Sequence, residues 1–227
     1  MGWLLLFLDI AFSIQVGYCS GMRTSVYIDG FNLYYGAVKG TPYKWLDLEK
    51  MVGSLLGEGH DLVRIKYFTA IVSARSPNDR SALNQQLYLR AVRSNPLIEV
   101  HLGHFMTHPV PMRLVSDPSR SVRVIKTEEK GSDVNLATHM VVDGFHDEYD
   151  CAVMITNDSD LSEPFRVVRE VLGKRTGVIC PHNRRVSQQL AKHANFIKKI
   201  RAGLLGASQL PDQLSDAKGE IHKPKSW

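Results

Sequence analysis

Short apolar runs alternate along the chain with longer segments in which apolar residues recur every three or four positions. The runs predict strands at 24–29, 62–70, 98–103, 123–126, 151–156 and 176–180. The longer segments predict helices at about 45–56, 79–94, 133–143, 161–172 and 185–193. This alternation is typical of an α/β domain with a mainly parallel sheet covered by helices.

Three segments lack these patterns. Residues 106–121 contain three prolines, Pro109, Pro111 and Pro118, and are expected to form an irregular loop or flap. Residues 203–227 show no periodicity. Residues 1–21 are apolar but have no basic start, contain Asp9 and are too short to span a bilayer, so we interpret them as an extension from a mispredicted start. The expected organisation is an extension at 1–21, one domain at 22–201 and a tail at 202–227.

The composition indicates which partners and which cellular location to expect, but it does not identify a function. The chain has 227 residues, a formal charge of +5 and a pI of about 9.1, which favours anionic partners. Cys19, Cys151 and Cys180 form no CxxC pair, so neither a zinc module nor a disulfide framework is indicated. We expect buried free thiols, a cytoplasmic location and no membrane association, and leave a homo-oligomer open.

Acidic residues stand where predicted strands end. Asp29 closes the first strand, and Asp158 follows the strand at 151–156. If these strands are neighbours, both side chains point into the crevice beyond the carboxyl ends of the sheet. Asp133 lies in the first turn of a predicted helix, on the apolar stripe with Leu136 and Met140, and is expected to lean over the same edge.

Several carboxylates in a partly dry crevice repel one another unless a cation lies between them. All-oxygen ligation suits Mg²⁺ or Mn²⁺, and such an ion can activate water against a phosphodiester. The simpler alternative is that Asp158 or Asp160 caps the helix expected from about Leu161, because aspartate is a favoured N-cap residue. Capping accounts well for Asp160 but poorly for Asp29 at the end of an apolar strand.

Other enzyme classes lack their motifs. No GxxxxGK[ST] loop is present, and no GxGxxG follows a strand. Phe31 occupies the position where a haloacid-dehalogenase-like phosphatase needs its second acid. Basic residues precede Asp133 and crowd the last third of the chain, while Phe31, Tyr34 and Tyr35 follow Asp29 and could stack on unpaired bases. Solvated charges and core packing are the alternative interpretation of both groups.

Three stretches in this order resemble the NYN domain of LabA-like proteins, within the PIN-like nuclease superfamily. They are YIDGFNLYYG at 27–36, EEKGSDVNLA at 128–137 and ITNDSDLSEP at 155–164. The resemblance covers roughly residues 22–201, and the closing HKPKSW is similar to the tail of a bacterial subgroup. It implies a Rossmann-like three-layer α/β/α sandwich whose acids bind Mg²⁺ or Mn²⁺ and whose substrate is RNA.

Carried onto this sequence, the resemblance implies specific site residues. The metal-binding and catalytic acids are Asp29, Asp133, Asp158 and Asp160, and Asn32 orients water or phosphate. One departure is that Asp133 stands where many PIN-like nucleases have a glutamate, which has a longer reach. The predicted substrate contacts are Lys130, Thr156, Asn157, Tyr34 and Arg184, with Thr156 and Asn157 also supporting the acids.

The sequence therefore predicts a metal-dependent ribonuclease acting on single-stranded or structured RNA. The alternative is a regulatory module that binds RNA or a protein and keeps the acids as a vestigial metal site.

Overall fold

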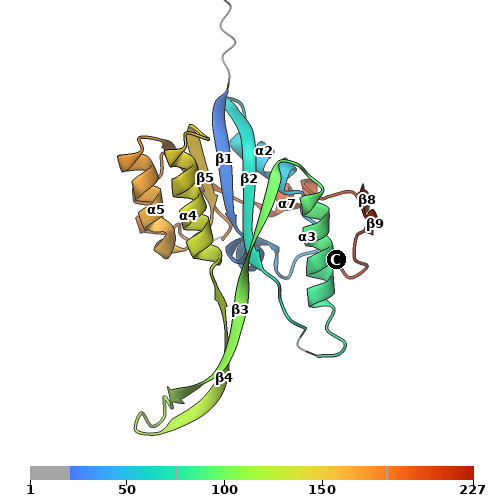
Figure 1. Ribbon diagram of the computed structural model, residues 1–227, viewed down its shortest axis with the longest axis vertical. Helices are drawn as coiled ribbons and strands as arrows, with labels where there is room; N and C mark the ends of the chain where they lie inside the picture. Colours follow the sequence, from blue (N-terminus) through green and yellow to red (C-terminus); the bar gives the residue numbers. More distant parts are fainter. Residues whose placement is uncertain (1–20, 75, 183) are drawn as a thin grey trace, which may run out of the picture.

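A seven-stranded sheet with the order β4-β3-β2-β1-β5-β6-β7 forms the centre of the computed structural model, which describes residues 21–74, 76–182 and 184–227 (Figure 1). The strand pairs are parallel except β3 with β4. The extension predicted at 1–21 lies almost entirely outside the described residues. The strands are β1 (Met22–Asp29), β2 (His60–Ala70), β3 (Ile98–Arg113), β4 (Ser121–Lys130), β5 (Cys151–Ile155), β6 (Arg175–Cys180) and β7 (Phe196–Lys199).

Helices cover both faces of the sheet, so the predicted three-layer α/β/α fold is confirmed (Figure 1). One core lies under α2, α3 and α7, and the other lies under α4, α5 and α6. Among the described residues, no helix is long and apolar enough to cross a membrane. The α-helices are α1 (Gly30–Leu33), α2 (Leu48–Leu56), α3 (Ser81–Arg93), α4 (Ser132–Phe145), α5 (Ser162–Arg166), α6 (Gln188–Lys192) and α7 (Ala202–Ala207).

Strand alternation explains the two cores. In β1, Val26 and Ile28 enter the first core while Tyr27 enters the second. Successive side chains of a strand point to opposite faces, and here both faces are covered. β1 and β5 are therefore apolar on both sides, as expected for strands in the middle of a parallel sheet.

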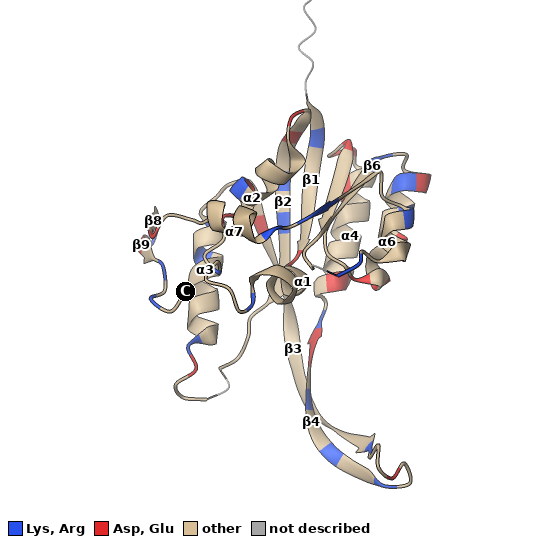
Figure 2. Cartoon of the chain, turned by 180° about the vertical axis from the view of Figure 1, so that it is seen from behind, with Lys and Arg blue, Asp and Glu red and all other residues tan. Residues whose placement is uncertain are grey.

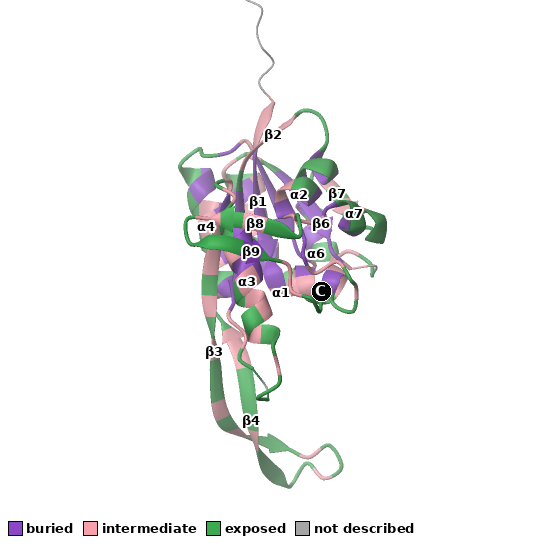
Figure 3. Cartoon of the chain, turned by 90° about the vertical axis from the view of Figure 1, so that its right-hand side faces the viewer, coloured by how far each residue is buried: buried purple, intermediate pink, exposed green. Residues whose placement is uncertain are grey.

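The prediction of an irregular loop at 106–121 was wrong over most of its length. β3 continues to Arg113 and pairs in antiparallel register with β4, from His104 opposite Lys130 to Arg113 opposite Ser121. Proline is compatible with this pairing because the far edge of β3 is free at these positions. The result is a long hairpin that projects from the body (Figures 1 and 3).

Other boundaries also differ from the prediction. The helix predicted at 161–172 is divided into a 3₁₀ turn (Ser159–Leu161), α5 and a π-helical segment (Val167–Val171). A second π-helical segment (Tyr34–Val38) follows α1. Strand β7 was missed because it is only four residues long and carries two lysines.

The C-terminal segment, for which the sequence shows no periodicity, is folded. It contains α7 and the hairpin of β8 (Gln213–Asp216) and β9 (Gly219–His222). Arg90 of α3 donates to both carboxylate oxygens of Asp216. The Trp227 ring packs against Trp45 and Tyr88, with centroid separations of 6.3 and 5.9 Å. Such elements show no periodicity because each makes only one or two buried contacts.

A buried ion pair joins β2 to α4. Lys66 Nζ donates to Asp143 Oδ2 at 2.6 Å, and both side chains are 8% exposed. The Tyr27 hydroxyl donates to the same oxygen at 2.7 Å. Removing one member of such a pair leaves the other charge buried without its partner.

We expect Asp143→Ala to lower the free energy of unfolding by about 3 kcal/mol, because the buried Lys66 ammonium then keeps only its longer ion pair with Glu99, at 3.8 Å. Urea unfolding followed by circular dichroism measures the loss. The matched control is Glu163→Ala, which removes an exposed partner of Arg166 and should cost less than about 1 kcal/mol. Equal losses in the two variants would contradict a special role for the buried pair.

Candidate active site

The carboxyl ends of β1 and β5 bring the first two predicted acids to one edge of the sheet. These strands are direct neighbours, with Ile28 opposite Ile155, so the adjacency that the sequence only suggested is confirmed. β1 pairs with β2 on its other side. The chain thus leaves β1 and β5 in opposite directions, and ligands collect at such switch points in α/β sheets. Figure 2 shows acidic segments at this edge, beside α1.

Asp29 is held firmly at the end of β1. Its side chain accepts hydrogen bonds from the Asn32 backbone N–H at 2.9 Å and from the Thr156 hydroxyl at 3.0 Å. Only 5% of Asp29 is exposed, and burial raises the pKa of its carboxyl, with the charge on Asp158 adding to this and the hydrogen bonds opposing it. Glycine is required at position 30, because a Cβ there would lie 2.7 Å from the Phe68 carbonyl.

Asp158 caps the turn that follows β5. Its carboxylate accepts from the Asp160 backbone N–H at 3.0 Å, and its own N–H donates to the Thr156 hydroxyl at 3.1 Å. Of the two acids that could cap this helix start, the N-cap is therefore Asp158, and Asp160 supplies the backbone N–H that it accepts. Asp29 is also an N-cap, that of α1. Capping therefore accounts for this acid as well, although the sequence offered little support for that role there. Capping uses one oxygen of each carboxylate and leaves lone pairs for a ligand.

Asp133 completes the acidic cluster, which we define as Asp29, Asp133, Asp158 and Asp160. It lies in the first turn of α4 and is exposed, whereas the sequence placed it over the sheet edge and away from water. Partial burial nevertheless raises the pKa of its carboxyl to about 6, and the charges on Asp29, Asp158, Glu129 and Asp160 contribute. The carboxylates therefore lie within electrostatic reach of one another.

Glu129 at the end of β4 is an acid that the sequence reasoning did not assign. It accepts from the Ser132 N–H at 3.1 Å and from the Ser132 hydroxyl at 2.6 Å, which fixes the start of α4. The end of β4 can lie this close to β3 only because residue 103 of β3 is glycine. A Cβ at that position would lie 2.1 Å from a Glu129 oxygen. The sequence did contain a signal for Glu129, because this acid stands three residues before the first residue of α4, which starts at the same edge of the sheet.

Asn32 links three segments of the site. Its Oδ1 accepts from the Asn157 backbone N–H at 3.0 Å and lies 3.0 Å from His182 Nε2. This oxygen is therefore occupied, and the Nδ2 amino group is what Asn32 can offer to water or phosphate. His182 was also missed, although it closely follows the end of β6 at the same edge of the sheet.

The predicted substrate contacts fall into two groups. Thr156 is buried against Asp29, and the Asn157 amide bonds Ser187 and Arg185, so both support the cluster. The others lie around it: Lys130 is exposed at the end of β4, Arg184 is exposed in the loop after β6, and Tyr34 turns toward a separate pocket. Direct substrate contact by these three stays a prediction.

The donor chemistry of the cluster suits Mg²⁺ or Mn²⁺, which prefer carboxylate oxygens. Among the described residues, however, no three Asp, Glu, His or Cys side chains are arranged to hold one ion between them. Mg²⁺ usually binds through only one or two carboxylates, with waters and substrate phosphates completing its shell. The residues therefore fit an ion held in that way, while direct ligation by all four acids stays a prediction.

A pocket of about 660 Å³ adjoins the cluster on the other side of the Gly30–Phe31 backbone. Its volume is within the range of small-molecule sites. The aromatic side chains in its wall are Phe31, Tyr34, Tyr35, Tyr88 and Trp227, and the cations are Lys39, Lys44 and Arg80.

Comparison with known proteins shows which family, which curated sequence and which solved structure this chain resembles. The family model of the NYN domain matches residues 23–204. The chain is 35% identical over 237 aligned positions to 6-hydroxy-3-succinoylpyridine 3-monooxygenase HspA of Pseudomonas putida, which covers 91% of this chain and 75% of that protein. It is also similar to the crystal structure of a protein of unknown function from Vibrio parahaemolyticus, with a TM-score of 0.52 and 18% identity over 80% of this chain and 94% of that one, which supports the fold.

The raised pKa of Asp133 predicts how stability depends on pH. Its pKa is about 6 in the folded chain and 3.8 in an unfolded one, so the native state binds the proton more tightly. This acid then destabilises the fold above about pH 6, and that effect fades as pH falls toward 4. We expect Asp133→Asn to raise the free energy of unfolding by about 1 kcal/mol at pH 7.5, a value reduced for exposure, and to change little at pH 4.

Urea titrations at the two pH values measure this difference in the absence of divalent ions. The matched control is Asp61→Asn, an exposed aspartate at the opposite end of β2. A stabilisation by Asp133→Asn that is the same at both pH values would show that repulsion within the cluster is not its cause.

Proposed function

Because this chain belongs to the NYN domain family, we propose that it is a metal-dependent ribonuclease that hydrolyses RNA phosphodiester bonds at the acidic cluster. The NYN domain indicates the PIN-like nuclease superfamily, whose members generally use divalent metals. The observation that supports this proposal most strongly is the meeting of Asp29, Asp133 and Asp158 in one electrostatic field at the switch point of the sheet.

Of Asp29, Asp133, Asp158 and Asp160, one or two would hold Mg²⁺ or Mn²⁺ directly, and the others would contact the waters bound to it. When bound, such an ion supplies positive charge for the phosphodiester and makes water more acidic. Thr156 and the α1 backbone fix the orientation of Asp29, so little reorganisation is needed on binding. The Asn32 amino group can donate to a phosphate oxygen.

The alternative within the same family is a regulatory module that binds RNA or a protein without cleaving RNA. The stretches at 27–36, 128–137 and 155–164 resemble LabA-like proteins, and some proteins with this domain have regulatory roles. We propose a cytoplasmic location, supported by the buried free thiols of Cys151 and Cys180.

We expect Asp29→Asn and Asp158→Asn each to lower the rate of RNA cleavage at least about 100-fold, because each removes a charge that an ion needs. The measurement is cleavage of a mixed set of labelled RNAs by the purified chain with Mg²⁺, Mn²⁺ or EDTA. Asp61→Asn is the control and should keep the full rate. Cleavage that survives both substitutions, or that never occurs with either metal while RNA still binds, would favour the regulatory module.

A second candidate function is oxidation of a small aromatic acid in the pocket beside the cluster. The curated relative is named for oxygenating 6-hydroxy-3-succinoylpyridine, a planar ring that carries a carboxylate. The pocket offers aromatic walls and three cations, which suit such a molecule. A monooxygenase inserts one atom of O₂ into its substrate and reduces the other to water, so an external two-electron donor is required.

Turnover of 6-hydroxy-3-succinoylpyridine with NADH and ¹⁸O₂, followed by mass spectrometry, tests this candidate. We expect Trp227→Ala to raise KM about 10-fold through lost ring contact, while Phe145→Ala, an exposed residue on α4, leaves KM unchanged. No incorporation of ¹⁸O by the wild-type chain would exclude the reaction for this substrate.

A further inference from the structure

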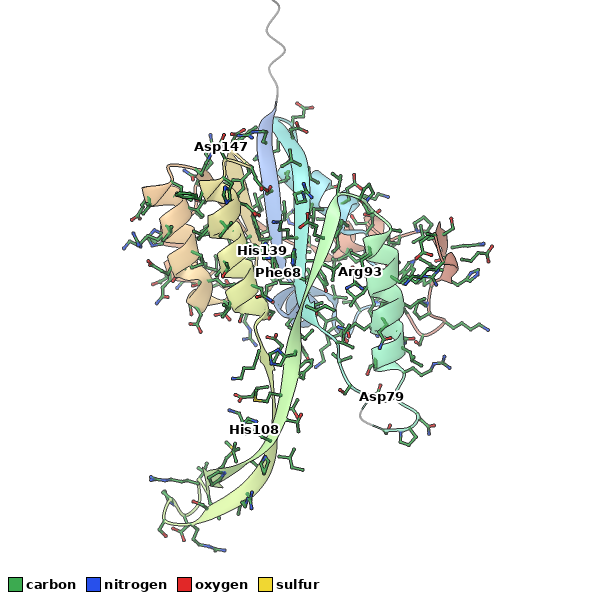
Figure 4. The ribbon with its side chains drawn as sticks, viewed as in Figure 1. Phe68, Asp79, Arg93, His108, His139 and Asp147 are labelled. Carbon is green, nitrogen blue, oxygen red and sulfur yellow. The ribbon has the colours of Figure 1, made fainter. Side chains whose placement is uncertain are left out.

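The hairpin of residues 104–130, here called the arm, has no supporting layer. Up to Gly103, β3 pairs with β2, and from His104 onward it pairs, within the part of the chain that the structure describes, only with β4. Figures 1 and 3 show the arm leaving the body with mostly exposed or half-exposed residues. Figure 4 places His108 well out along it. A two-stranded hairpin in water is marginally stable at best, so the arm is expected to contact a partner.

One surface of the arm is continuous with the acidic cluster. Phe105 and Glu129 are opposite each other in the register. The Phe105 ring packs edge-on to Phe31 at 5.8 Å, and Glu129 contributes to the field at Asp133. Because side chains alternate between faces, this surface continues through every second residue. It consists of Phe105, Thr107, Pro109, Pro111 and Arg113 on β3, and Ser121, Arg123, Ile125, Thr127 and Glu129 on β4.

The far end of this surface is basic. Arg113 and Arg123 lie on it, and Arg120 lies in the connecting turn; all three are exposed. In the described part of the chain, none of these three guanidinium groups forms an ion pair, whereas Lys126 and Lys130 are both paired with Glu128. Free guanidinium groups are well suited to phosphate oxygens. Figure 2 shows the basic positions spread along the arm.

We propose that the arm binds the phosphate backbone of an RNA strand and guides it to the acidic cluster. This inference rests on the proposed nuclease function, because it assigns the substrate's path to the same site. Glu129 and Arg123 are six residue steps apart along β4, which corresponds to about 20 Å. An extended strand of several nucleotides therefore reaches from the acids to the arginines, with Thr107 and Thr127 lying between.

A second copy of the chain is the competing occupant. Pro109 and Pro111 have no N–H, so the free edge of β3 lacks two of the donors that another strand would need. Strand addition is therefore disfavoured on this edge. The exposed Met106, Met112 and Val122 lie on the opposite surface of the arm, where contact between copies would leave the arginines available.

The test compares two triple variants with the same change in charge. The arm variant is Arg113→Gln, Arg120→Gln and Arg123→Gln. The control variant is Lys50→Gln, Arg93→Gln and Lys218→Gln, which removes exposed charges from α2, α3 and the C-terminal hairpin; Figure 4 shows Arg93 away from the arm. Fluorescence anisotropy with labelled oligouridylate, in EDTA and over a range of salt, gives the Kd without cleavage.

We expect the arm variant to raise the Kd at least about 10-fold and to reduce the slope of log Kd against log salt by about 2, as three lost phosphate contacts predict. The control should keep the wild-type slope. Equal affinity and slope in all three proteins would overturn the proposal, and so would a dimer that the arm variant dissociates, by light scattering, without a change in RNA affinity.

The same proteins separate this inference from the proposed nuclease. Arm-dependent binding by a chain that cuts no RNA with Mg²⁺ or Mn²⁺ would retain the arm and reject the nuclease. Cleavage with affinity unaffected by the arm substitutions would retain the nuclease and reject the arm.

Discussion

Electrostatic repulsion between carboxylates at the ends of β1 and β5 is the constraint on which the site depends. The parallel pairing of these strands puts Asp29 and Asp158 at the same edge. The Thr156 hydroxyl holds the two acids together, because it donates to the Asp29 carboxylate and accepts from the Asp158 backbone N–H. Burial raises the pKa of Asp29 and Asp133, and the neighbouring negative charges raise both further. A cation is the simplest partner that makes such an arrangement favourable.

Helix capping and the proposed ion binding would use the same groups here. The N-cap bonds made by Asp29 and Asp158 are ordinary helix-start bonds, and they also fix the direction of each carboxylate. Structural and functional interpretations of these acids are thus not exclusive, since a carboxylate that accepts one backbone N–H still has lone pairs for another ligand. Asn32 behaves in the same way: its side-chain oxygen accepts from the Asn157 N–H, and its amino group is the donor that it can offer to a ligand.

Two structures flank the acids and correspond to the two candidate activities. The arm extends the site along a basic surface suited to a polyanion, while the aromatic pocket beyond Gly30 is suited to one small ring. Phe31 contributes to both, because it lines the pocket and packs against Phe105 of the arm. The similarity to a monooxygenase and the match to the NYN domain both extend over most of the chain, so neither comparison by itself favours one of these two parts.

The sequence by itself determined the layered α/β fold, because β1, β2 and β5 are buried on both faces and α2 and α4 on one, and burial leaves a periodic pattern. It also determined which acids end strands, since Asp29 and Asp158 directly follow apolar runs. Only the tertiary structure decided that β1 lies beside β5, that Glu129 and His182 join the site, and that residues 106–121 form part of an arm. These depend on contacts between residues far apart in the chain, and exposed strands such as the arm bury too little surface to leave a pattern.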